Sequence, residues 1–136
     1  MEADPTVKPA DDEIYISEII VEVDGIRETQ FHALRFPNRS AIYPEVIGRV
    51  GVSTVPPVAS MRQLFVAEKF RYRGIGSQLV QACKGAARRD GCEALNLSLN
   101  PMNHHLGRKF YEPRGFSLAA EFADGDRCYA INLKRP

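Results

Sequence analysis

The sequence has few cysteines and no long apolar run, and these two shortages exclude several classes of protein. Its cysteines are Cys83, Cys92 and Cys128, an odd number at wide spacing. This spacing argues against a disulfide framework and a zinc site, so we expect reduced, structural thiols. No apolar stretch approaches 18 residues, and no charged-then-apolar leader opens the chain. We therefore expect a cytoplasmic protein without a membrane partner.

The charge of the chain is also nearly balanced, which argues against a general nucleic-acid binder. The net charge is +1, but residues 1–68 carry six Lys or Arg against eleven Asp or Glu, and residues 69–114 carry nine against three. A binder using Arg71, Arg73, Arg88 and Arg89 would need a broad basic face. It would also lack the aromatic stacking surface of single-strand readers. We expect no nucleic-acid partner.

The length and composition suit one domain. The chain has 136 residues, of which 44% are hydrophobic, and this is ordinary for a single globular core. Residues 1–12 contain two prolines and four acids and little apolar content, so we expect a flexible tail there. Residues 13–136 are expected to form the domain.

Apolar periodicity and turn residues predict an α/β pattern. After the first strand, Asp24 could cap a short helix, or Asp24-Gly25 could form the turn of a hairpin, and we favour the helix. The predicted strands are 14–23, 41–43, 46–54, 61–66, 95–99, 115–118 and 128–133, and the predicted helices are 25–36, 74–89 and 101–111. Strands joined through a helix pair in parallel, and a ligand enters such a sheet at the carboxyl ends of its strands.

The segment between the strand ending at Val66 and the helix from Gly74 has the features of an anion site. Glycines at 74 and 76 let backbone N–H groups approach a ligand. The start of a helix directs unpaired N–H groups and the positive end of its dipole toward this turn. Arg71 and Arg73 add full charges. The segment therefore predicts a site of diphosphate size.

The glycine spacing distinguishes between kinds of anion site. The G-x-G-x-x-G of dinucleotide sites and the G-K-[ST] of nucleotide P-loops are both missing. What remains is Arg71-x-x-Gly74-x-Gly76 directly after a strand. This pattern resembles the acyl-coenzyme-A-binding motif, Q/R-x-x-G-x-G/A, of the GNAT superfamily of N-acetyltransferases.

A second segment resembles the same family. His104-x-x-Gly107-x-x-Phe110-Tyr111 is followed by Gly115-Phe116, whereas the late helix of the family often reads N-x-x-A-x-x-hydrophobic-Tyr before a Gly-Phe strand. The match departs at His104 and Gly107, where the family usually has asparagine and alanine. Asn100, Asn103 or His104 could make the coenzyme contact of this first turn. The two signatures together cover residues 46–120.

The resemblance implies a fold and an activity. The fold would be a single GNAT-like domain whose mostly antiparallel, mixed sheet splays at a central parallel pair, with flanking helices and a contracted N-terminal helical region. The activity would be transfer of acetyl from acetyl-CoA, as co-substrate, to a primary amine by direct attack through a tetrahedral intermediate. The residues implied to bind the coenzyme are Leu64, Phe65, Val66, Arg71, Tyr72, Arg73, Gly74, Ile75, Gly76, Ser77 and His104.

Residue roles in the chemistry follow in part from this resemblance. Tyr111 resembles the tyrosine of the family that protonates the leaving thiolate. The strand segment 60–63 has no carboxylate, so Glu45, Glu18 and His32 are the candidates for the base. Adjacent helical histidines point about 100° apart and cannot easily chelate one ion, so we expect no metal at His104 and His105.

The acceptor and the assembly stay open. A small-molecule or a protein amine is compatible with the sequence, as is a homodimer. The acidic excess before residue 69 would suit a cationic acceptor, but an acidic solvated surface explains it equally well. The alternative function is a sensor or protein-interaction module that binds acyl-CoA with little or no turnover.

Overall fold

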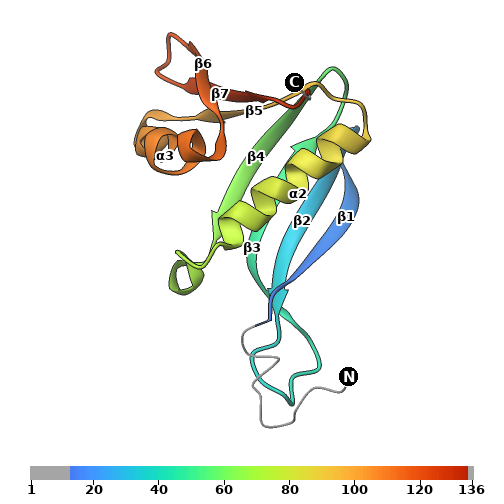
Figure 1. The fold of residues 1–136 in the computed structure, drawn as a ribbon. Coiled ribbons are helices and arrows are strands. Elements are labelled where there is room, and N and C mark those ends of the chain that lie inside the picture. The colour runs from blue at the N-terminus through green and yellow to red at the C-terminus, as the bar shows by residue number, and fades with distance from the viewer. Residues whose placement is uncertain (1–12, 135–136) are drawn as a thin grey trace.

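Residues 13–134, which are the residues that the structure describes, contain one seven-stranded mixed sheet in this computed structural model (Figure 1). The tail predicted for residues 1–12 lies outside the described residues, as do residues 135–136. The strands are β1 (Tyr15–Val23), β2 (Ile26–Arg35), β3 (Glu45–Ser53), β4 (Val58–Val66), β5 (Ala94–Leu99), β6 (Ser117–Glu121) and β7 (Arg127–Asn132). The helical elements are α2 (Ile75–Arg89), the one-turn α3 (His104–Leu106), 3-10 turns at Glu68–Phe70, Pro101–Asn103 and Glu112–Arg114, and a π turn at Gly107–Tyr111.

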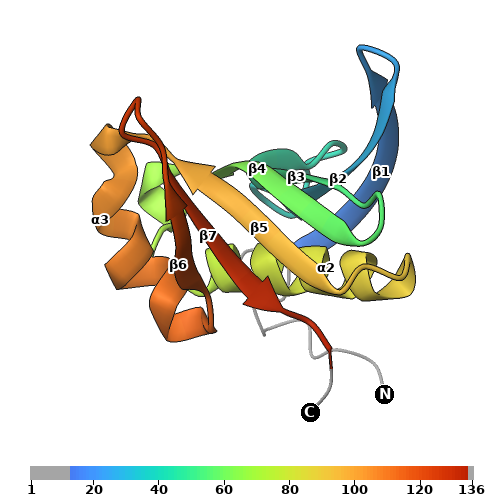
Figure 2. The same cartoon turned by 90° about the horizontal axis from the view of Figure 1, so that it is seen from above.

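The sheet has the predicted mixed topology. The strand order is β1-β2-β3-β4-β5-β7-β6, and β4 and β5 form a parallel pair at its centre. The other neighbouring strands pair antiparallel. Viewed from above, β5, β6 and β7 turn away from β1–β4 (Figure 2). The prediction of a mostly antiparallel sheet that splays at a parallel pair is therefore confirmed.

The helix predicted for residues 25–36 is wrong, because this segment is β2. Asp24 and Gly25 both have positive φ, 52° and 79°. Two such residues form the tight turn whose twist suits a two-residue hairpin, so β1 leads directly into β2. Thr29, Phe31 and Ala33 alternate toward the core as a strand requires. The contracted helical region expected at the N-terminus is accordingly absent from residues 13–35.

The strand predicted for residues 41–43 is also wrong. These residues form part of the loop between β2 and β3, and Ile42 and Tyr43 are about 80% exposed. They have no strand partner within the described residues, so their β-favouring side chains have no surface to pack on. The strand predicted over 46–54 is confirmed as β3.

Helix α2 covers one face of β2, β3 and β4 (Figure 1). Its predicted apolar side, which includes Ile75, Leu79, Val80 and Cys83, is buried. Each of the three aliphatic side chains contributes about 1.5–3 kcal/mol when it is fully removed from water. Burial raises the pKa of Cys83 to about 12, so this thiol stays protonated at neutral pH and serves packing. None of the helices in residues 13–134 is both long and apolar enough to cross a membrane.

The helix predicted over residues 101–111 is present but irregular. Residues 101–114 change from a 3-10 turn through one α turn and a π turn to another 3-10 turn. Leu106 and Phe110 pack against the core, as predicted. A Cβ at Gly107 would overlap the Tyr129 phenol of β7. Glycine stands where the family usually has alanine because the tyrosine fills that space.

Candidate functional site

Strand β4 carries a bulge, and beyond its first three residues it separates from β5. Between its pairs with Gly51 and Arg49, β4 has one residue more than β3. Gln63 lies in this bulge with a φ of 60°, and a bulge of this kind bends a strand and changes the direction of its backbone groups. Because β4 pairs with β5 only over Val58–Ser60, the two strands part beyond that point.

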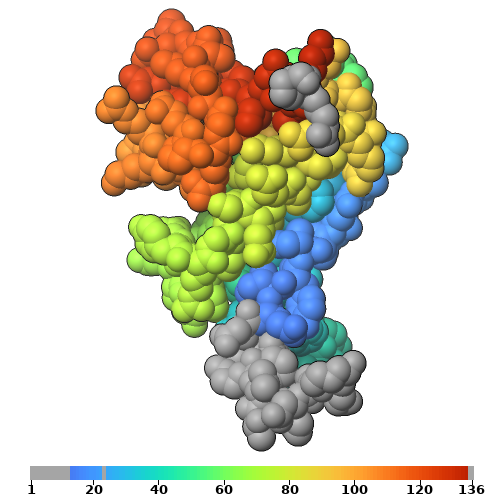
Figure 3. Space-filling model, in the orientation of Figure 1, coloured from blue at the N-terminus to red at the C-terminus, as the bar shows by residue number. Residues whose placement is uncertain are grey.

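A cleft of about 790 Å³ lies where β4 and β5 part. It extends from the bulge of β4 past the start of α2 to the helical segment 101–114, and the surface is hollowed between these parts (Figure 3). Nine of the eleven residues predicted to bind the coenzyme line it, namely Leu64, Phe65, Val66, Arg71, Tyr72, Gly74, Ile75, Gly76 and Ser77. The structure therefore brings the predicted strand, turn and helix start to one surface.

The turn before α2 exposes backbone N–H groups to this cleft. Gly74 has a φ of 84° and directly precedes the helix, a conformation that favours glycine. The first helical hydrogen bond runs from Gln78 N to Gly74 O, so the amides of residues 75–77 precede it. Gly76 lies against the Phe110 ring, because a Cβ there would come within 3.1 Å of that ring.

The two predicted arginines of the turn lie differently. Arg71 lines the cleft, and its Nε donates a hydrogen bond to the Val66 carbonyl at 2.8 Å. This bond fixes the side chain against the end of β4. Arg73 does not line the cleft; its guanidinium lies 5.4 Å from the centre of the Phe70 ring.

Tyr111 lines the cleft opposite the turn, and only 3% of its surface is exposed. Edge-to-face contacts with Phe110 and Phe116, at ring-centre distances of 4.9 and 5.5 Å, hold its ring. Burial raises the pKa of its phenol, with a smaller contribution from Cys83 and an opposing one from Arg114. No described residue forms a hydrogen bond with the Tyr111 hydroxyl. The cleft therefore contains a neutral O–H donor.

Arg114, which the sequence analysis did not select, joins the two walls of the cleft. Its Nε donates to Ser77 Oγ and its Nη1 to the Phe110 carbonyl, both at 2.7 Å. Its guanidinium also stacks 3.8 Å from the centre of the Phe110 ring. These contacts hold the first turn of α2 against the segment that carries Tyr111. A basic residue directly before Gly115 was the only signal of it in the sequence.

His104 lies outside the cleft. Its Nε2 is 2.7 Å from the Gly125 carbonyl in the β6–β7 turn. Asn103 and His105, on either side of it, line the cleft instead. Asn103 was one of the three alternatives for the coenzyme contact, and the geometry favours it over His104.

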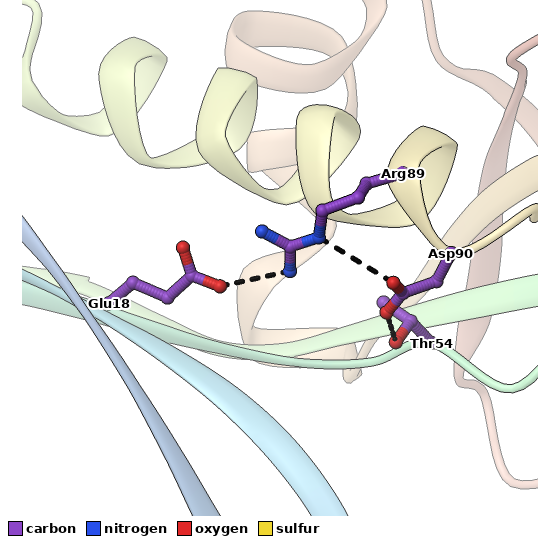
Figure 4. A network of polar contacts seen from close by, with 4 residues as sticks. All are labelled: Glu18, Thr54, Arg89 and Asp90. Carbon is purple, nitrogen blue, oxygen red and sulfur yellow. Dashed lines mark hydrogen bonds and ion pairs between the residues drawn. The ribbon is translucent and has the colours of Figure 1, made fainter.

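None of the three candidate bases lines the cleft. Glu18 pairs with Arg89 at 2.9 Å near the end of α2, where Asp90 also accepts a hydrogen bond from Thr54 (Figure 4). Glu45 pairs with Arg35 at 2.8 Å, and His32 contacts the Gln30 amide at 3.3 Å. All three candidate side chains therefore have partners on other residues, and none of them lines the cleft.

The charged residues that do line the cleft are all basic: Arg62, Arg71, Lys109 and Arg114. One carboxylate is connected to the cleft through Arg62: Glu28, on β2 of the same sheet, forms an ion pair with it. Sequence analysis missed both of these residues. Their contact joins positions 34 residues apart and depends on strand register, so no local motif signals it.

Comparisons with known proteins agree on one family. The model of the acetyltransferase (GNAT) family matches residues 11–116. Among solved structures, PaiA N-acetyltransferase from Thermoplasma acidophilum in complex with coenzyme A has a TM-score of 0.64 at 16% identity, covering 77% of this chain and 60% of that one. Aminoglycoside 6'-acetyltransferase type Ii has a TM-score of 0.64 at 19% identity, covering 80% and 72%. A GNAT-family acetyltransferase from Staphylococcus aureus Mu50 has a TM-score of 0.63 at 17% identity, covering 79% and 69%.

Comparison with curated proteins gives no match. The structural similarities, all below 25% identity, establish the fold, and the family model covers well over half of the chain. The fold and the two sequence signatures agree with that model. This chain belongs to the GNAT acetyltransferase family.

Proposed function

We propose that this protein is an N-acetyltransferase that moves acetyl from acetyl-CoA to a primary amine. The observation that carries the proposal is the course of the cleft. One continuous surface joins the positive-φ turn before α2 to the buried phenol of Tyr111. The family supplies the reaction class, and the cleft supplies a path between the two groups that the reaction needs.

The residues at the turn fit a coenzyme diphosphate. The amides of Gly74–Ser77 precede the first helical hydrogen bond, and the positive end of the α2 dipole lies there. Arg71 adds a full charge on the cleft wall. Asn103 replaces His104 as the proposed contact from the opposite wall. An anionic ligand at this turn would therefore meet hydrogen-bond donors, and no Asp or Glu is among the described residues that line the cleft.

The bulged strand fits the extended arm of the coenzyme. Leu64, Phe65 and Val66 line the cleft beyond the bulge, where β4 no longer pairs with β5. Backbone groups on an unpaired strand edge can bind an amide-bearing ligand as another strand would. The same donors can stabilise negative charge on a carbonyl oxygen held beside them.

Acetyl-CoA, when bound, supplies an activated acyl thioester. Tyr111 holds a proton on its hydroxyl, and burial keeps that proton in place at neutral pH. Because this hydroxyl has no bond to a described residue, it is available to donate to a sulfur that leaves the acyl group. We propose this role for Tyr111. The amine must lose a proton, and with no carboxylate among the lining residues described, solvent is the proposed receiver.

A second candidate function, an acyl-CoA-binding module with little turnover, is favoured by the same lack of a lining carboxylate. Acetyl-CoA titration followed by release of free CoA from a panel of primary amines separates the two. The proposed function predicts saturable binding and amine-dependent CoA release. Saturable binding with no release above the blank for any amine would favour the module. Propionyl-CoA and longer thioesters in the same assay test the preference for acetyl. The cytoplasmic location of the protein stays a prediction.

A further inference from the structure

The cleft has a basic group that a coenzyme diphosphate would not reach. Arg62 lines the cleft on β4, before the bulge, whereas the amides of the turn follow the other end of the strand. Val66 is four positions further along the strand, which corresponds to at most about 13 Å at about 3.3 Å per residue, because the bulge at Gln63 lies between them. A diphosphate held at the turn therefore leaves Arg62 for another ligand group.

Arg62 is held in place by a buried acid. Its Nε donates to Glu28 Oε1 at 2.7 Å, and the side chain of Glu28 is 6% exposed whereas that of Arg62 is 55% exposed. Gln30 donates to the second carboxylate oxygen of Glu28 at 3.1 Å. A Cβ at Gly51 would come within 2.6 Å of that oxygen, so the glycine leaves room for the carboxylate.

This arrangement presents the outer part of the guanidinium. No residue among 13–134 accepts a hydrogen bond from the terminal nitrogens of Arg62. An arginine fixed through Nε keeps two parallel N–H groups in the geometry that matches a carboxylate. The buried acid therefore orients Arg62 while leaving these two groups for a ligand.

A second guanidinium lies on the same face of the sheet. Arg49 is two residues before Gly51 on β3, so their positions share a face. Its guanidinium lies 5.7 Å from the centre of the Phe65 ring, and Phe65 lines the cleft. Within the part of the chain that the structure describes, no acid pairs with Arg49. A basic residue therefore lies on either side of the bulge: Arg62 before it, and Arg49 opposite Phe65 after it.

Three of the acids before residue 69 are already paired with arginines. Glu18 pairs with Arg89, Glu45 with Arg35, and Glu28 with Arg62. An acceptor that carries positive charges besides its amine would meet basic side chains, and no Asp or Glu, in the described lining of the cleft. The electrostatics favour the opposite charge beside the reacting amine.

We propose that the acceptor is a primary amine that carries a carboxylate, such as an amino acid or an acidic peptide N-terminus, and that Arg62, positioned by Glu28, binds this carboxylate. Arg49 adds positive charge beside Phe65. The inference rests on the acyl transfer proposed above and names its substrate class. Arg62 is a specificity-determining residue in this account, and Glu28 is a positioning residue.

Matched acceptors test the proposal. Glycine, leucine, phenylalanine and glutamate are compared with their carboxamides, and peptides that begin with Glu are compared with peptides that begin with Gln. We expect kcat/KM to be at least about 10-fold higher for the carboxylates, since hydrogen bonds to charged groups are the strong ones. The amino-acid and peptide arms show which source of the carboxylate the cleft accepts.

Variants assign the preference to residues. Arg62→Gln should raise KM for the carboxylate acceptors at least about 10-fold and leave the carboxamides unchanged. Arg62→Lys keeps the charge but loses the paired N–H groups, and Glu28→Gln removes the charge that holds the guanidinium. For both variants, KM for the carboxylate acceptors should lie between the values for wild type and Arg62→Gln. Arg88→Gln, an exposed arginine on α2, is the control and should change neither set. CoA affinity and the melting temperature verify that each variant is folded.

A binding readout separates failure of this inference from failure of the proposed function. N-acetyl amino acids, titrated into the protein with CoA present, should bind wild type more tightly than Arg62→Gln. Carboxamides that react as well as the carboxylates, or an Arg62→Gln variant that slows both sets equally, would overturn the inference while acyl transfer stands. Acetyl-CoA binding without transfer to any amine contradicts the proposed function, and N-acetyl amino acid binding then decides the role of Arg62 by itself.

Discussion

Changing Gly76 to Asp should abolish coenzyme binding through charge, with little loss of stability. Gly76 lies in the first turn of α2 and lines the cleft. A carboxylate there would face the proposed diphosphate. Two unit charges 4 Å apart repel by about 1 kcal/mol in water and by about 4 kcal/mol near a protein surface. Two phosphate charges therefore give about 2–8 kcal/mol, which weakens binding at least about 30-fold.

Two further variants separate charge from bulk and from helix effects. Gly76→Ala adds only a Cβ, which meets the Phe110 ring at 3.1 Å and requires that ring to shift slightly; we expect less than about a 10-fold loss of affinity. Gly85→Asp adds the same acid to an exposed position of α2 with nothing within 4 Å of its Cβ. It should bind CoA like wild type.

Isothermal titration calorimetry with CoA measures the three affinities, and thermal melting monitors the fold. An aspartate in the first turn of a helix interacts favourably with the dipole, by about 0.3–1 kcal/mol. Gly76→Asp should therefore melt near Gly76→Ala. A CoA affinity of Gly76→Asp within twofold of wild type, in a folded protein, would refute the assignment of this turn to the diphosphate.

Three other changes test the chemistry and the packing. Tyr111→Phe should lower kcat by about 10²–10⁴ in steady-state kinetics, with acetyl-CoA affinity and melting temperature unchanged because the hydroxyl bonds no described residue; full activity would show that the proton has another source. In a pH profile, kcat/KM should rise as the amine loses its proton, up to about pH 8 for a peptide N-terminus and up to about pH 10 for a lysine-like amine. Burial raises the pKa of Tyr111, so this acid should cause no fall in that range, and a decline between pH 7 and 9 would contradict its role. Gly107→Ala should lower the free energy of unfolding by about 1–3 kcal/mol in denaturant because its Cβ overlaps Tyr129, whereas Gly85→Ala, in open space, should raise it by up to about 1 kcal/mol; equal effects would show that Gly107 is not confined.

Local sequence was sufficient to predict the strand, turn and helix that line the cleft. Gly74, the apolar face of α2 and the Asp90-Gly91 end of the helix each follow from interactions within a few residues of one another. The helix predicted over 25–36 failed because Ile26, Phe31 and Leu34 approximate helical spacing. The hairpin that forms there instead depends on a positive φ at both Asp24 and Gly25. Which side chains of β2 are buried depends on the packing of α2 against the sheet, which comes from a distant part of the chain.

The parts of the site that sequence did not reveal depend on contacts between distant segments. Arg114 meets Ser77 across 37 positions, and Arg62 meets Glu28 across 34. His104 was misplaced for a different reason. The segment around it changes among 3-10, α and π spacing, so a regular helix assigns the wrong neighbour to the cleft.

The most direct test of the account is a titration of the ¹⁵N-labelled protein with CoA, followed by NMR. The account predicts saturable shifts of the backbone amides of Gly74, Gly76 and Ser77 at one common affinity, with the amide of Gly25 in the β1–β2 turn unmoved. Amides of the turn that stay in place while CoA binds, or shifts concentrated elsewhere, would contradict it.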